Sequence, residues 1–202
     1  MQRWLLAVVV CAVVTSLPSV AGQASGQPEL DPGDGQQLLK KLTEISRREN
    51  APAEARKPLV IYQREINAYV RFEATREILS GVTNLHISLR NSGAVAVQAT
   101  VNLSALRDAQ ALGPFDPLLY LSGRLPVIVG GVVRTQDGIA HVDVESVTIG
   151  GISMPSSMFA ELVGYYSRNE EYPAGVDVTE PFDLPYGISE LRVEHERVVV
   201  VQ

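Results

Sequence analysis

The feature that most constrains this chain is a long β-hairpin, which the sequence predicts over residues 119–149. Its first arm alternates apolar and polar residues with a period of two, which is typical of a strand with one buried face. Asp137-Gly138 then supplies the two residues with positive φ that a type I′ turn requires. The resulting register pairs Val133 with Val142. Long strands that are apolar on one side favour a sheet that forms a shell around apolar material.

The returning arm of this hairpin changes phase part-way along. Its apolar positions are Ala140, Val142, Val144, Val147 and Ile149. One extra residue at Glu145-Ser146 restores the alternation and pairs Val129 with Val147. We therefore predict a β-bulge at Glu145-Ser146, which would bend the sheet. Gly130 and Gly131 in the facing arm support a bend at the same level, because glycine within a strand marks a kink or a close approach.

Two shorter hairpins and three helices complete the expected elements. The hairpins cover residues 84–103 and 188–201, and the helices cover residues 36–48, about 63–79 and 155–168. The two turns place Leu89 opposite Val95 and Val193 opposite Val198. The sequence therefore predicts an α+β fold, in which a long curved antiparallel sheet of about six strands, bulged near Glu145-Ser146, cups two or three helices.

The N-terminal residues indicate export. Residues 1–21 predict a signal peptide, because Arg3 precedes an apolar run and Ser19-Val20-Ala21 fits a cleavage site. Cys11, the only cysteine, lies within that run, so the mature protein would have no thiol or disulfide. Residues 22–35 indicate a disordered spacer, and residues 36–202 a single α+β domain. We expect a periplasmic or secreted protein without a stable membrane anchor.

Charge and motifs exclude several function classes. The formal net charge of −6 argues against a nucleic-acid partner. The sequence has no nucleophile elbow, no zinc-protease motif and no phosphate-binding loop, so we expect no catalytic residue, no cofactor and no enzymatic activity. His141, Asp143 and Glu145 fall on one strand face, where they could hold a divalent ion. The same alternation describes the solvated face of a half-buried strand, which we favour, so no metal site is expected.

Apolar residues at inward positions are the candidates for binding an apolar ligand. They are Ile66, Tyr69, Val70, Leu125, Val127, Val129, Met158, Phe159 and Leu162. A second set lies in the long connection near the C-terminus and would form a lid: Tyr165, Tyr166, Tyr172, Phe182 and Tyr186. Plain core packing is the simpler explanation of the first set, and an ordered loop in place of a lid is the alternative for the second.

Four stretches of the chain resemble the YpmS-like family of bacterial envelope proteins and, more distantly, the tubular lipid-binding (TULIP) domains. These stretches are Glu65-Ile66-Asn67-Ala68-Tyr69-Val70, Gly123-Arg124-Leu125-Pro126, residues 144–155 and Leu184-Pro185-Tyr186-Gly187-Ile188. The resemblance implies a long curved sheet that cups a helix, with an apolar groove for lipid acyl chains. YpmS-like proteins usually keep an N-terminal membrane anchor, whereas this chain begins with a cleavable type of signal.

Three functions are therefore compared. The leading hypothesis is an exported soluble binding protein that acts as a carrier or chaperone for a lipid or other apolar ligand in the cell envelope. The alternative is a structural or interaction protein of the envelope, with a filled core and no ligand, that binds a protein partner through a sheet edge or an apolar helix face. A small hydrolase is third, and would require two carboxylates, or His141 with a carboxylate, in a cleft.

Overall fold

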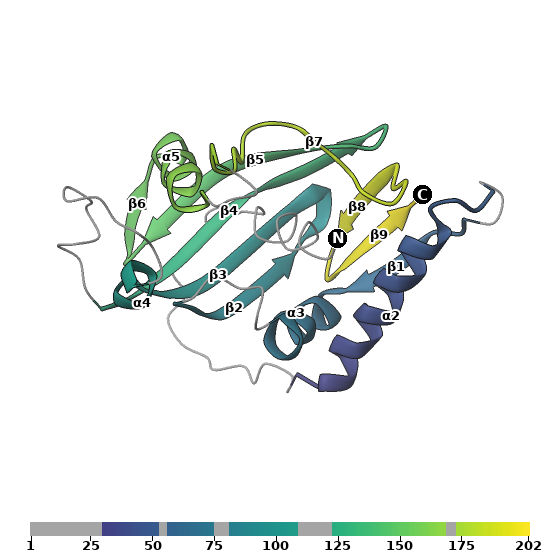
Figure 1. Cartoon of the computed structure of the whole chain (residues 1–202), viewed down its shortest axis with the longest axis horizontal. Helices are drawn as coiled ribbons and strands as arrows, with labels where there is room; N and C mark the ends of the chain where they lie inside the picture. The colour runs from purple at the N-terminus through teal and green to yellow at the C-terminus, as the bar shows by residue number, and fades with distance from the viewer. Residues whose placement is uncertain (1–29, 53–55, 75–80, 109–122, 169–172) are drawn as a thin grey trace.

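A computed structural model describes residues 30–52, 56–74, 81–108, 123–168 and 173–202 (Figure 1). The fold is α+β, as expected. The α-helices within these ranges are α2 (Pro32–Arg48), α3 (Gln63–Phe72), α4 (Leu103–Asp108) and α5 (Ser156–Tyr166). The expected signal peptide, residues 22–29 of the expected spacer and the end of the second expected helix lie outside the described residues.

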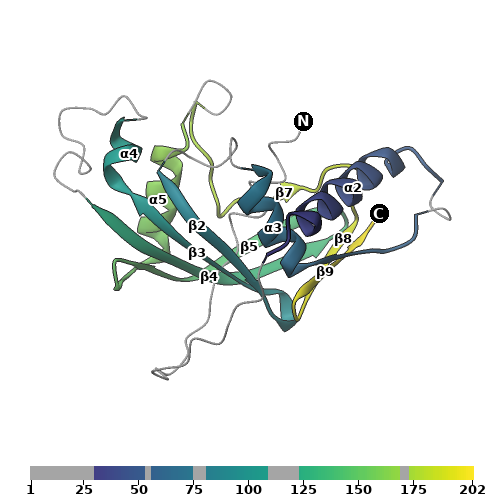
Figure 2. The ribbon, with the colours of Figure 1, turned by 90° about the horizontal axis from the view of Figure 1, so that it is seen from below.

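The larger sheet has six antiparallel strands. Its strands are β2 (Val82–Leu89), β3 (Ala94–Asn102), β4 (Arg124–Gln136), β5 (Ile139–Ile149) and β6 (Ile152–Met154), in that order, with β7 (Phe182–Asp183) paired to β5. Figure 2 shows that this sheet is curved and that α2, α3, α4 and α5 lie on the same side of it. The expected curved sheet cupping its helices is confirmed.

The bulge of the long hairpin is also confirmed. Gly130 pairs with Ser146 and Gly131 pairs with Val144, so Glu145 is the extra residue. The turn at Asp137 and Gly138 has positive φ at both residues, at 52° and 81°, which is the type I′ geometry that the sequence predicts. The first four positions of the expected strand, residues 119–122, lie outside the described residues, and Gly123 forms a bend before β4.

A second, smaller sheet was not expected. It has the order β1-β9-β8 and consists of β1 (Leu59–Tyr62), β8 (Glu190–Glu194) and β9 (Arg197–Val201). The C-terminal hairpin has the predicted register, with Val193 opposite Val198, but it pairs with β1 and not with the large sheet. The pairing of β1 with β9 joins residues about 140 positions apart. No local sequence pattern predicts a pairing over such a distance.

Helix α2 begins four residues earlier than expected, inside the segment predicted to be spacer. Asp31 caps the helix by accepting a hydrogen bond from the Gly33 N–H at 2.8 Å, and Pro32 occupies the first helical position, where proline is favoured. Gly35 then passes close to α3, since a Cβ there would lie 3.1 Å from the Tyr69 backbone nitrogen. These four residues are therefore part of the folded domain.

Helix α3 covers the exposed edge of the large sheet. The Asn67 side chain donates to the Ile87 carbonyl at 2.8 Å and accepts from the Ile87 N–H at 2.7 Å, as a neighbouring strand would. One turn earlier, the Gln63 side chain accepts from the Leu89 N–H at 2.6 Å. Asn67 is 2 % exposed. Two side chains of α3 therefore satisfy the edge of β2, where unpaired groups would be costly.

Replacing Asn67 with Ala should destabilise the protein strongly. The variant leaves the buried N–H and carbonyl of Ile87 without their partners, which costs about 2–4 kcal/mol of unfolding free energy. Urea denaturation measures the loss. The matched control is Asn91→Ala, which removes an exposed hydrogen bond to the His195 N–H and should cost less than about 1 kcal/mol. Similar small losses in both variants would contradict the assigned role of Asn67.

Candidate functional site

The main core contains an apolar cavity of about 130 Å³. It lies where the small sheet meets the end of the large one, and α2 and α3 form the side opposite the strands. The remaining wall is the segment 184–188, which links β7 to β8. Almost every atom that lines the cavity is apolar. The site is therefore a space suited to hydrocarbon, and none of the described residues that line it is charged.

The lining follows from the patterning of each element. On α3, Ile66, Tyr69 and Val70 are spaced three and four residues apart, so they share one helix face and all line the cavity. On the strands, alternate residues face it because the side-chain period is two. They include the cross-strand pairs Leu89 with Val95, Leu191 with Val200, and Val193 with Val198. The apolar faces of the helix and the strands, which the sequence predicts, thus meet around the cavity.

Glu65 precedes Ile66 on α3 and forms an ion pair outside the cavity. Glu65 is 1 % exposed, and both its oxygens accept hydrogen bonds from Lys41 Nζ of α2, at 2.7 and 2.8 Å. The Tyr62 N–H donates to the same carboxylate at 2.9 Å, and Lys41 also donates to the Val60 carbonyl at 2.6 Å. A buried ion pair requires such additional hydrogen bonds to offset its desolvation. Glu65 therefore fixes α2, α3 and β1 together and does not contribute charge to the cavity.

The cavity represents a cost to the fold. At about 24 cal/mol per Å³, an unfilled apolar cavity of about 130 Å³ destabilises a domain by roughly 3 kcal/mol. Protein cores are otherwise packed as densely as organic crystals, so a space of this size is uncommon. An apolar cavity of about 150 Å³ in another protein stays dry and binds benzene or xenon. The geometry here suits a ligand of that size.

The predicted ligand-binding residues divide between two places. Ile66, Tyr69 and Val70 line the cavity. Val127 and Val129 of β4 belong to a second cluster at the other end of the sheet, where they pack with Phe159 of α5. Leu125 is partly buried near the turn that joins β5 to β6. The two predicted groups therefore do not form one groove among the described residues.

Helix α5 buries less than the sequence predicts. Met158 is 50 % exposed, which corrects the expectation that it points inward. Leu162 and Phe159 are only partly buried, and no described side chain of α5 is fully buried. The helix is apolar on most of its surface, so its sequence does not specify a single inward face. Met158 consequently lies on the solvent side.

The residues predicted to form a lid are also separated. Tyr165 lies on α5, 43 % exposed, with Arg168 stacked 5.2 Å from its ring centre. Phe182 belongs to β7 and packs against the main core, whereas Tyr186 lines the cavity. The side chain of Tyr166 and all of Tyr172 lie outside the described residues. Of the predicted lid residues whose side chains the structure describes, Tyr186 alone lines the cavity.

The three histidines remain apart in the structure. His141 is exposed on β5 beside Asp143, which forms an ion pair with Arg134, and Glu145 is the bulged residue. His195 lines a separate polar hollow at the tip of the β8–β9 hairpin. Over the described ranges, no three His, Cys, Asp or Glu side chains are grouped closely enough to hold a metal ion. His141, Asp143 and Glu145 are all exposed on β5.

Comparisons with known proteins give no family. The chain matches no protein-family model, and no curated protein has detectable sequence similarity to it. The resemblance to the YpmS-like and TULIP families therefore stays a prediction. Among the helices that the structure describes, none combines the length and the apolar character needed to cross a bilayer.

Filling the cavity should stabilise the protein. Val200→Ile adds one methylene group at a residue that lines the space, which should raise the unfolding free energy by about 1 kcal/mol. The control is Val147→Ile, which adds the same group to a residue that is 2 % exposed in the second cluster and should be neutral or destabilising. Thermal denaturation of both variants provides the measurement, and equal effects would show that the space around Val200 is already filled.

His86 should make stability depend on pH. Burial within β2 lowers the pKa of His86 below its ordinary value of 6.5, because desolvation disfavours the charged ring. The unfolded chain therefore binds this proton first, and the unfolding free energy falls as the pH drops through about 6.5. The unfolding free energy of the His86→Gln variant should fall less between about pH 7.5 and pH 5.5 than that of the parent protein. Urea denaturation at both pH values measures the difference, and an equal decline in the two proteins would contradict this effect of His86.

Proposed function

We propose that this protein binds a small apolar molecule, or the end of one hydrocarbon chain, in the cavity between its two sheets. The observation that carries the proposal is the cavity of about 130 Å³ with an almost wholly apolar lining. Apolar surface gains about 25 cal/mol per Å² when it leaves water. Such a ligand would be selected by its size and shape, because none of the lining side chains that the structure describes is charged.

The volume limits the ligand. Pockets for drug-sized ligands measure about 300–1,000 Å³, so a whole diacyl lipid exceeds this cavity. A ring of six carbons, or a few carbons at the end of an acyl chain, is the appropriate size. The proposed role is therefore a carrier or chaperone that shields a short apolar group, and the predicted signal peptide would place this role in the periplasm or outside the cell.

A second candidate function is an envelope interaction protein that binds a protein partner. It is favoured by exposed apolar side chains at the opposite end of the molecule, on α5 and β6: Ile152 is 75 % exposed, Met158 50 % and Tyr165 43 %. Exposed apolar patches mark contact surfaces more often than isolated apolar residues do. In this alternative, the cavity is an imperfection of packing and holds no ligand.

Binding of small apolar probes distinguishes the two functions. Benzene, toluene and n-butylbenzene would be titrated at millimolar concentrations while thermal stability and two-dimensional NMR spectra are recorded. We expect saturable shifts at Ile66, Val133 and Val200 with dissociation constants of about 0.1–1 mM, because only about 4–6 kcal/mol is available from so small a surface.

The matched variants make this test specific. Val193→Ile combined with Val200→Ile fills the cavity from two strands and should weaken probe binding at least about ten-fold, whereas Val147→Ile should leave it unchanged. Native mass spectrometry of the protein from a lipid-containing lysate would then reveal a natural ligand. Shifts confined to α5 and β6, with none in the cavity, would support the interaction protein and contradict the proposed ligand site.

A further inference from the structure

The segment Pro185–Ile188 forms one wall of the cavity. Pro185, Tyr186 and Ile188 line the space, while Gly187 between them is exposed. Tyr186 has a φ of 58° and Gly187 a φ of 64°. Positive φ is unfavourable for a residue as bulky as tyrosine and persists only where surrounding contacts hold it. The cavity wall is therefore strained at this segment.

Both ends of this segment are fixed to one residue. The Leu184 N–H donates to the Gly138 carbonyl at 2.7 Å, and the Gly138 N–H donates to the Ser189 carbonyl at 2.9 Å. Gly138 lies in the turn of the long β4–β5 hairpin. Because Leu184 and Ser189 flank the cavity-lining residues, these two hydrogen bonds fix both ends of a short loop.

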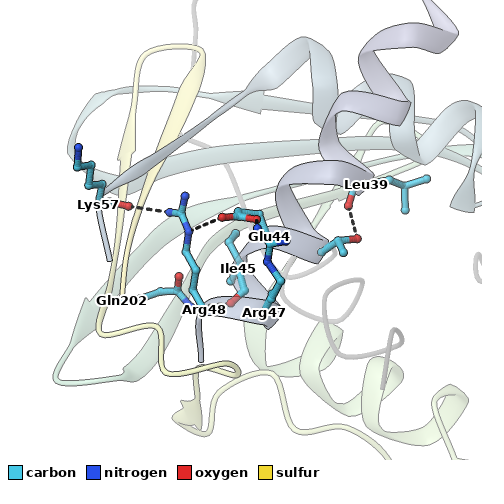
Figure 3. A network of polar contacts seen from close by, with 8 residues as sticks. Leu39, Glu44, Ile45, Arg47, Arg48, Lys57 and Gln202 are labelled. Carbon is cyan, nitrogen blue, oxygen red and sulfur yellow. Dashed lines mark hydrogen bonds and ion pairs between the residues drawn. The ribbon is translucent and has the colours of Figure 1, made fainter. Parts of the chain in front are cut away.

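The side chain of Gln202 bonds to the middle of the segment. Gln202 Nε2 donates to the Tyr186 carbonyl at 2.7 Å and to the Ile45 carbonyl at 2.8 Å. Ile45 lies in the last turn of α2, where carbonyls have no partner within the helix, and Figure 3 shows Gln202 beside it. Ile45 and Tyr186 both line the cavity. The amide of Gln202 thus joins two walls of the cavity across the edge of the segment.

The C-terminal end of α2, to which Gln202 bonds, is fixed by other contacts as well. Arg48, in the same turn of α2, donates to Glu44 at 2.8 Å and to the Lys57 carbonyl at 3.2 Å (Figure 3). The hydrogen bond from Arg48 is the main cause that lowers the pKa of Glu44. Arg48 therefore anchors this end of α2 independently of Gln202.

We infer that apolar ligands reach the cavity through Pro185–Ile188, which opens as a flap hinged at Gly138 and latched by the side chain of Gln202. This inference rests on the proposed function, because it describes how that site is entered. The latch controls the rates of binding and release. It has little effect on the affinity, since Gln202 itself does not line the cavity.

Amide hydrogen exchange tests the flap without any ligand. The Ile188 N–H bonds to the Pro185 carbonyl within the segment and reports its opening. Gln202→Glu keeps the shape of the side chain but removes both donated hydrogen bonds, and should accelerate exchange at Ile188 about ten-fold or more. Exchange at Ile66, in the core of α3, should not change. Thr43→Ala, which removes an exposed hydrogen bond to the Leu39 carbonyl on α2, is the control and should leave Ile188 unaffected.

Binding kinetics then test the function of the flap. NMR line shapes with toluene as the probe should give association and dissociation rates that both rise about five-fold or more in Gln202→Glu, with the dissociation constant within about two-fold of the parent value. If amide exchange at Ile188, or the rates of toluene association and dissociation, are unchanged in Gln202→Glu, then Gln202 does not control the opening of the flap. Faster exchange at Ile188 combined with no toluene binding to the parent protein would show that the flap exists and that the proposed function is wrong.

Discussion

The structure depends on the polar bonds that hold helix α3 in place. Its residues bond to three neighbours: Glu65 to Lys41 of α2, Asn67 to Ile87 of β2, and the Gln63 N–H to the Glu196 carbonyl at 2.8 Å. Glu65 and Asn67 are nearly inaccessible to water, where a lost partner is expensive. These bonds are directional, so they fix both the position of the helix and its rotation.

This fixed helix explains why a cavity can persist in the core. Hydrophobic side chains alone would draw α3 toward the strands until the space closed, because dense packing is favourable. The bonds of Glu65 and Asn67 prevent that movement. A similar bond joins the two sheets, since the Thr135 hydroxyl donates to the Leu191 carbonyl at 3.1 Å and accepts from the Leu191 N–H at 2.8 Å. The cavity is thus the space left between elements that polar contacts hold in fixed positions.

Much of the fold follows from local sequence. Alternation and turn chemistry predict the register of the long hairpin and its bulge at Glu145-Ser146, because both signals lie within the strands they describe. The small sheet was missed because β1 has only four residues and pairs with β9 at the far end of the chain. The cavity-lining face of α3 was predicted, but its companions on β8 and β9 were not, since only the tertiary pairing brings them to it. Met158 was placed inward because α5 is apolar on most sides.

Diffraction from crystals of the protein under xenon pressure tests the central claim most directly. Xenon enters dry apolar cavities of this size and marks them by its strong scattering. If the bonds of α3 keep the space open, one xenon site should appear between Tyr69, Val133 and Val200, without movement of the surrounding backbone. The absence of xenon there, with side chains packed together across the space, would contradict the account.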